Sequence, residues 1–166
     1  MGRVQESVAE MYLGRRLSWG DAPFQTQVKT KSTERITDSA AAATAMATGV
    51  TVNNDVISEF LPGNGSAIFT SLEYYQHLQN KKTAIVTNTE ILHATPAAFA
   101  SHQKDRSEYS QIWEDYLISR PNILMGGGRE EVNLSDAEKA GYKVATSKTD
   151  MLQFKASDEF GIFLYL

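Results

Sequence analysis

The stretch Thr83-Ala84-Ile85-Val86-Thr87 is a short apolar run with several β-branched side chains, and it predicts a buried strand. The residues before it, 66–82, carry apolar side chains at helical spacing. After it, Thr95 and Pro96 suit the N-cap and the first position of a second helix. The pattern therefore predicts a helix on each side of this strand along the chain.

The same alternation continues toward the C-terminus. We expect a helix at 109–117, a strand at 122–125 followed by three glycines, a helix at 135–140, a strand at 142–145, a short helix after Ser147, and a strand at 162–165. Helices interleaved with short apolar strands predict an α/β fold, with a mainly parallel sheet covered by helices on both faces in three layers. Ligands of such folds bind beyond the carboxyl ends of the strands.

The N-terminal half is predicted to be mainly helices and loops. We expect a helix at 3–13, a loop at 17–27, a short strand within 26–36, a helix at 39–48 that ends at Gly49, and a helix capped by Ser66 with Ile68, Leu72, Tyr75 and Leu78 on one face.

Composition limits the class of protein. The 166 residues, with 42% apolar and 22% charged side chains, match one globular domain with a core. The net charge of −4 is spread along the chain, so nucleic acid is not an expected partner. With no cysteine, any metal ion must be held by oxygen and imidazole ligands. No apolar run approaches the roughly 20 residues that cross a bilayer, and residues 1–7 do not follow the pattern of a signal peptide.

Ser39 is the sharpest candidate for chemistry. A hydroxyl on the first turn of a helix faces unpaired N–H groups and the positive end of the helix dipole, a place that favours phosphate. The plainer interpretation is that Asp38 or Ser39 only caps an alanine-rich helix. Spacing alone does not decide between the two.

From Asp38 to Asn54 the chain resembles the nucleophile site of the alkaline phosphatase family, with Asp-Ser-Ala, a helix of small residues containing Thr-Ala, a glycine and an asparagine-containing turn. The resemblance implies that Ser39 attacks phosphorus and becomes a phosphoserine. It implies two zinc ions that activate the serine oxygen and stabilise the leaving oxygen. It also implies that Asp38 helps to position a phosphate-binding arginine.

A second block, residues 86–102, resembles the strand and magnesium-site turn of the same family. It implies that Thr95 is a hydroxyl ligand of one magnesium ion, and that His93 contacts this ion through water. Arg106 falls where the family has the arginine that grips two phosphate oxygens. Without the resemblance, these three are a helix cap, a loop histidine and a surface arginine. The resemblance also extends to residues 123–129, where we interpret the three glycines as a structural turn, because no Gly-Lys-Ser sequence follows.

The family's chain is longer, and this sequence departs from the family pattern at both ends. Met1-Gly2 resembles the end of an Asp-Gly-Met-Gly turn, so a bridging aspartate is expected just before residue 1, and further metal ligands beyond Leu166. We therefore expect residues 1–166 to form a single, incomplete catalytic domain that lacks the first strand of its central sheet.

Three function hypotheses follow. The first is an alkaline phosphatase that hydrolyses phosphate monoesters, of which the chain alone turns over slowly or not at all, because its three histidines cannot complete two zinc sites. The second is a phosphate-binding or structural fragment without chemistry. The third, a serine hydrolase using Ser39 with His93 or His102, lacks the Gly-x-Ser-x-Gly elbow. A homodimer and the cellular location stay open, although family members usually work in the periplasm, outside the cell or at its surface.

Overall fold

The computed structural model describes residues 11, 14, 23–24, 26, 28–34, 36–155 and 158–165. Within these residues the elements follow one another in this order: α2 (Ser39–Thr48), α3 (Ser71–Glu73), the π-helical turn η2 (Tyr74–Leu78), β1 (Ala84–Glu90), α4 (Ala94–Ala97), α5 (Tyr109–Ser119), β2 (Ile123–Gly127), the 3-10 turn η3 (Arg129–Glu131), α6 (Leu134–Lys139), β3 (Lys143–Ala145), α7 (Lys148–Met151) and β4 (Gly161–Leu164).

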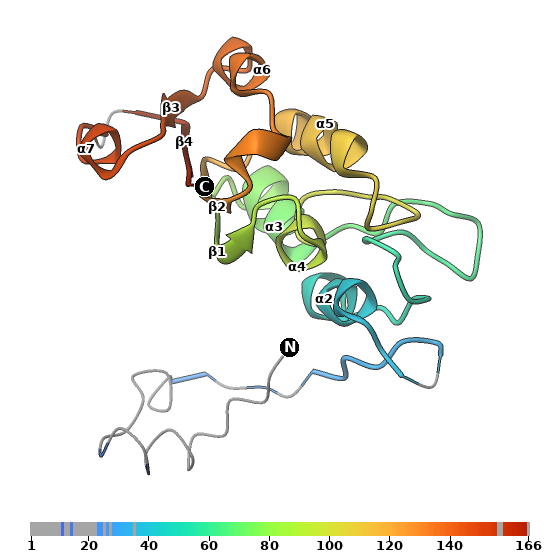
Figure 1. Cartoon of the computed structure of the whole chain (residues 1–166). Coiled ribbons are helices and arrows are strands. Elements are labelled where there is room, and N and C mark those ends of the chain that lie inside the picture. Colours follow the sequence, from blue (N-terminus) through green and yellow to red (C-terminus); the bar gives the residue numbers. More distant parts are fainter. Residues whose placement is uncertain are drawn as a thin grey trace.

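The described strands form one four-stranded sheet in the order β1-β2-β4-β3, and every neighbouring pair is parallel. The register places Ile85 beside Leu124 and Leu124 beside Ile162, so three apolar side chains form a row across the sheet. Figure 1 shows α3, α4 and α5 together on one side of this sheet and α7 on the other. The predicted α/β fold with a mainly parallel sheet is confirmed.

The core lies between the sheet and α5. On α5, Ile112, Trp113 and Tyr116 are buried at the 3.6-residue spacing that aligns side chains on one helix face. They pack in the same cluster as Leu124 and Ile162 of the sheet. The hydroxyl of Tyr116 donates a hydrogen bond of 2.8 Å to the carbonyl of Ile91, so this buried polar group is paired.

Helix α2 lies beside α4, away from the strands (Figure 1). It is rich in alanine, and Ala40, Ala41 and Ala43 are completely buried. Small side chains allow two helix backbones to approach closely. The predicted end of α2 is also confirmed, because Gly49 adopts the left-handed conformation with a φ of 77°.

Several helix and strand boundaries differ from the sequence-based expectations. The α3–η2 helix begins after Thr70, whose side chain and Glu73 form a reciprocal capping box, so the Ser66 cap was wrong. Its predicted apolar face is largely exposed, with 54% of Tyr75 and 64% of Leu78 accessible. The described part of 26–36 contains no strand, so that prediction was wrong as well.

A third difference concerns the helix near residue 95. Helix α4 begins at Ala94 with His93 in the N-cap position, so Thr95 is a helical residue and not the cap. Apart from Met11, the expected helix at 3–13 lies outside the described residues, as does most of the expected loop at 17–27. The interpretation of 1–166 as one domain stays a prediction.

In the part of the chain that the structure describes, no helix is long and apolar enough to cross a membrane.

Candidate phosphate site

The site is built on the first turn of α2. Asp38 is the N-cap residue in extended conformation, and its Oδ1 atom accepts a hydrogen bond of 2.9 Å from the N–H of Ala41. Such a cap satisfies one of the N–H groups that a helix start leaves unpaired. Ser39 follows as the first residue of the helix. Its hydroxyl therefore lies at the positive end of the helix dipole, as the sequence predicted.

The loop after α2 returns to brace this turn. The Asn54 side-chain oxygen accepts a hydrogen bond of 3.2 Å from the N–H of Asp38, while its amide nitrogen donates to the carbonyl of Ile36 and the carboxylate of Glu34. Sequence analysis placed Asn54 only at the end of a motif and gave it no role. In the structure, Asn54 hydrogen-bonds to the backbone of Ile36 and Asp38, the residues just before Ser39.

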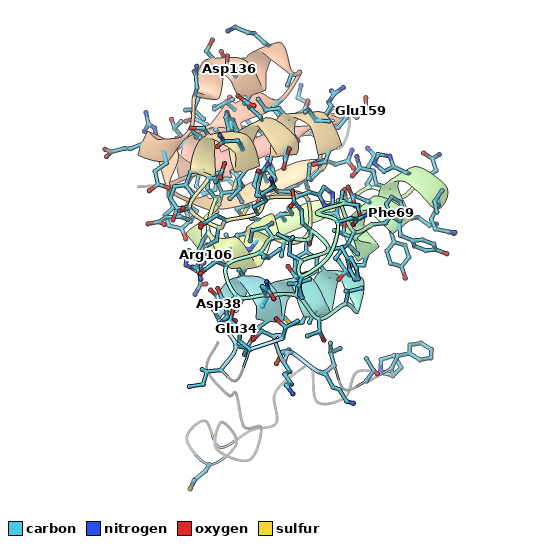
Figure 2. All side chains as sticks on the ribbon, turned by 90° about the vertical axis from the view of Figure 1, so that its right-hand side faces the viewer. Glu34, Asp38, Phe69, Arg106, Asp136 and Glu159 are labelled. Atoms are coloured by element: carbon cyan, nitrogen blue, oxygen red, sulfur yellow. The ribbon has the colours of Figure 1, made fainter. Side chains whose placement is uncertain are left out.

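Arg106 closes the site from a distant part of the chain. Its Nη1 atom donates to Ser39 Oγ at 2.6 Å and to Asp38 Oδ2 at 3.2 Å, and the side chain is about three-quarters buried, with 27% accessible. Figure 2 shows Arg106, Asp38 and Glu34 one below another along the same edge of the molecule. The arrangement places a permanent positive charge directly on the serine hydroxyl.

Asp38 is held in its ionised form. Burial alone raises the pKa of this carboxyl, but the N–H groups of Ala41, Ala40 and Asp55 and the guanidinium of Arg106 outweigh burial, so its pKa lies below the ordinary 3.8. An ionised Asp38 can serve two partners at once, because one oxygen caps α2 and the other contacts Arg106. It thus couples the position of the arginine to the start of the helix.

His93 lies on the other side of the arginine. Its Nε2 atom is 3.1 Å from Arg106 Nη2, and because a guanidinium nitrogen can only donate, Nε2 must be the acceptor. A neutral His93 then carries its proton on Nδ1, which is buried and has no hydrogen-bond partner among the described atoms. In this arrangement neither ring nitrogen offers a lone pair to a metal ion. A direct metal bond to Nε2 requires that the contact with Arg106 be broken.

Thr95 does not join this cluster. No hydrogen bond connects its side chain with Asp38, Ser39, His93 or Arg106 in the described structure, and Thr95 instead lines an open groove of about 550 Å³ along β1. Within the described residues, no group of three or more His, Asp or Glu side chains is arranged to hold an ion. A zinc site requires about four ligands. The described residues therefore supply only part of a metal site, and the buried Nδ1 of His93 is an orphaned polar atom beside it.

The histidine geometry does not support a serine hydrolase. His93 contacts Arg106, and His102 contacts Ser58 and Glu73, so neither ring is hydrogen-bonded to Ser39. A nucleophile and its base are expected within hydrogen-bond reach of each other.

The triple glycine has a packing role. A side chain at Gly126 would lie 2.8 Å from Thr87 Cγ2 and 3.1 Å from the Thr89 carbonyl, so only glycine allows β1 to approach β2 this closely. Gly128, with a φ of 83°, precedes the turn at Arg129. This agrees with the interpretation of the segment as structural.

Together, the fold and the site define an α/β protein with a parallel sheet and a serine hydroxyl at a helix N-terminus that faces an arginine. Comparison with known proteins gives the family. A family model described as alkaline phosphatase matches residues 14–157. Alkaline phosphatase 3 of Bacillus subtilis is 34% identical over 173 aligned residues, covering 96% of this chain and 35% of that protein. Alkaline phosphatase 4 of the same organism is 36% identical over 77% of this chain and 30% of its own length.

Solved structures agree. The alkaline phosphatase of the Antarctic bacterium TAB5 superimposes with a TM-score of 0.79 at 25% identity, covering 96% of this chain and 49% of that chain. The Thermus thermophilus enzyme gives a TM-score of 0.75 at 25% identity, over 96% of this chain and 36% of its own. This chain belongs to the alkaline phosphatase family. It spans about a third of the length of the curated relatives it matches.

Proposed function

We propose that this chain carries the nucleophile and the phosphate-binding arginine of a metal-dependent phosphate monoester hydrolase that acts through a phosphoserine at Ser39. The observation that carries the proposal is the 2.6 Å contact between Ser39 Oγ and Arg106 Nη1 at the start of α2. Family membership supports the reaction class, since the relatives are named as phosphatases. One relative, from Streptomyces griseus, is named streptomycin-6-phosphate phosphatase, a name that describes a phosphate ester as substrate.

The chemistry follows from the position of the two side chains. Arg106 binds oxygens of the phosphate group with its planar fork and holds the phosphorus beside Ser39. Ser39 Oγ attacks phosphorus, an Oγ–P bond forms, and the ester P–O bond breaks as the alcohol leaves with the proton that Oγ loses. Water then hydrolyses the phosphoserine. A cation at Oγ favours the ionised oxygen, and the helix N-terminus favours the negative charge of the phosphate.

The proposed cofactors are two zinc ions and one magnesium ion. When bound, such ions activate the attacking oxygen and stabilise the leaving one. Ser39, His93 and Thr95 are the residues of this chain that we propose as contributors, His93 through water. A variant of the TAB5 enzyme, 24% identical to this chain, is described with magnesium bound, which supports a magnesium site in the family. Because the described residues provide only part of a site, we propose that the 166-residue chain alone is slow or inactive.

A second candidate is anion binding without chemistry. It is supported by the contact between Arg106 and Ser39 at the start of α2, whereas the ligands that the described residues offer a metal ion are few.

Covalent labelling distinguishes these functions even if turnover is slow. The chain is incubated with para-nitrophenyl phosphate, zinc and magnesium, quenched, and digested, and the peptide containing Ser39 is weighed by mass spectrometry. We expect the added mass of one phosphoryl group, lost in Ser39→Ala and kept in Ser71→Ala, which removes a hydroxyl at the first position of another helix. No label, together with phosphate binding that persists in a chelator, would support the second candidate. Rapid metal-stimulated hydrolysis lost in Ser39→Ala would overturn only the inactivity of the isolated chain.

A further inference from the structure

His102 lies between two hydrogen-bond acceptors. Its Nδ1 atom is 2.9 Å from the carbonyl oxygen of Ser58, and its Nε2 atom is 2.9 Å from Glu73 Oε1. Both side chains of the His102–Glu73 pair are largely buried, with 21% and 13% accessible. The second oxygen of Glu73 accepts from the N–H of Thr70 at 2.8 Å, within the capping box of α3. The ring thus joins the loop at residue 58 to the start of α3.

The identity of the partners determines the proton count. A carbonyl and a carboxylate only accept hydrogen bonds, so each ring nitrogen of His102 needs a proton between itself and its partner. Burial alone lowers the pKa of His102, but the hydrogen bonds to Glu73 and Ser58 outweigh it, so the pKa lies above the ordinary 6.5. For Glu73, burial raises the pKa, but the interactions with His102 and Thr70 together outweigh burial, so the pKa lies below 4.5.

The other charges near the ring are mainly negative. Asp115 of α5 accepts hydrogen bonds from the Ser101 hydroxyl at 2.7 Å and from the N–H of His102 at 2.9 Å. Glu59 also faces His102, and burial is the largest influence that raises the pKa of Glu59. Two further charged groups act on Glu59: Lys104, which is positive, and Glu108, which is negative. These carboxylates favour the charged form of the imidazole over the neutral form.

The same segment leads from His102 to the candidate site. The backbones of Ile57 and Gln103 exchange two hydrogen bonds of 2.8 Å each, and the N–H of Arg106 donates to the carbonyl of Asp55 at 2.8 Å. Residues 55–58 and 102–106 therefore run against each other as a short ladder. His102 fastens one end of this ladder, and Arg106 projects from the other end toward Ser39.

We propose that His102 is a pH-sensitive latch and a positioning residue for Arg106: its doubly protonated ring clamps Ser58 to Glu73 and so closes the ladder that presents the arginine. When the ring loses one proton, it keeps the Nε2–H that faces the Glu73 carboxylate, and the lone pair of Nδ1 then faces the carbonyl oxygen of Ser58; this contact becomes repulsive, and the ladder opens from the His102 end. This goes beyond the proposed function, because it concerns the placement of Arg106 whether or not Ser39 is phosphorylated.

The direction of the pH effect follows from the shifts. The folded pKa of His102 is raised, so its stabilisation is complete below about 6.5 and is lost as the pH rises through the folded pKa. The folded pKa of Glu73 is lowered, so its stabilisation is present above about 4.5 and is lost as the pH falls through the folded pKa. The latch is therefore closed between the folded pKa of Glu73 and the folded pKa of His102, and it opens at higher pH.

Nuclear magnetic resonance on the full chain tests the latch. Ring nitrogen shifts of His102 give its titration, and amide hydrogen exchange gives protection factors for Gln103 and Arg106, with Ile91 as a reference outside the ladder. Between about 6.5 and the folded pKa of His102 we expect protection at Gln103 and Arg106 to fall by up to about tenfold per pH unit, as release of one proton requires, and above the folded pKa we expect it to level off. Protection at Ile91 should not follow it.

Three variants make the test specific. Glu73→Gln should lower the His102 pKa and move the loss of protection to the same lower pH. His102→Gln should remove the pH dependence, and His77→Gln, at an exposed histidine of η2, should change neither quantity. If His102→Gln fails to fold, Glu73→Gln still decides. Deprotonation of His102 with unchanged protection at Gln103 and Arg106 would overturn the proposal. So would a Glu73→Gln variant that shifts the His102 pKa but not the pH at which protection is lost, or the reverse.

Discussion

Arg106 Nη1 lies 2.6 Å from Ser39 Oγ, although 67 residues separate the two in the chain. The same guanidinium contacts Asp38 through Nη1 and His93 through Nη2. One side chain thus contacts all the residues of the site that the structure brings together. The electrostatics of the serine hydroxyl therefore depend on how this single arginine is held.

Replacing Arg106 by lysine should weaken phosphate binding. Lysine keeps the charge but loses the planar fork that contacts Ser39, Asp38 and His93 together. Loss of one charge-assisted hydrogen bond, about 1.5–3 kcal/mol, corresponds to a fall in affinity of about tenfold or more. Phosphorus NMR titration measures this, with Arg129→Lys at an exposed position as control. Equal affinity in the two variants would contradict the role of the fork.

Substitutions at Asp38 should separate its cap from its charge. Asp38→Ala removes the cap of α2 and should lower the free energy of unfolding by about 1 kcal/mol. Asp38→Asn keeps a good cap and removes only the ion pair with Arg106, so it should lose less. Because the folded pKa of Asp38 is depressed, its contribution is full above about 3.8 and is lost as the pH falls through the folded value. Urea unfolding of both variants at several pH values measures these effects, and an Asn variant as unstable as Ala would argue against the cap.

Gly126→Ala should destabilise the sheet. Its new Cβ would lie 2.8 Å from Thr87 Cγ2 and 3.1 Å from the carbonyl of Thr89, so β1 and β2 must separate. Overpacking of this kind typically lowers the free energy of unfolding by about 1–3 kcal/mol. Phosphate affinity of the folded fraction should stay unchanged, since Gly126 touches no residue of the site. Thermal unfolding with and without phosphate distinguishes a loss of stability from a loss of phosphate affinity. A selective loss of phosphate affinity would instead indicate that the three glycines bind phosphate.

Tyr116→Phe should destabilise the core without a change in volume. The Tyr116 hydroxyl is the donor to the buried carbonyl of Ile91, at 2.8 Å, and its removal leaves that carbonyl unpaired, at a loss of about 1–3 kcal/mol. Burial raises the pKa of Tyr116 well above 10.0, so this phenol should not ionise before the protein unfolds. Ultraviolet titration checks this, with the exposed Tyr74→Phe as the stability control.

Some elements could be predicted from local sequence because local physics forms them. Asp38 as cap and Gly49 as left-handed end define α2 without help from distant residues. The strand around Ile85 and a helix at 109–117, observed at 109–119, were likewise predicted from periodicity, and the alternation of helices and strands predicted a parallel sheet. The family resemblance rested on the same local motifs, and the family is confirmed.

Other features depended on packing that no local pattern records. Ser66 and Thr70 are both acceptable caps, but the Thr70 hydroxyl also donates to the carbonyl of Phe99, so a tertiary hydrogen bond favours the later start. Tyr75 and Leu78 have the spacing of a buried face, yet the described structure packs only Leu72 of that helix into the core. Periodicity predicts which side chains share a face, not whether another element covers it.

The sequence by itself determined the alternation of helices and strands, the start and end of α2, and the residue types available for phosphate chemistry, because each depends on neighbours within a few positions. Only the tertiary structure decided that Arg106 reaches Ser39, that His93 turns its Nε2 to that arginine, and that Thr95 stands apart. These relationships join residues from separate elements. Their geometry is set by how α2, the loop at 53–58 and the segment at 102–106 pack and hydrogen-bond to one another, which no single stretch of sequence specifies.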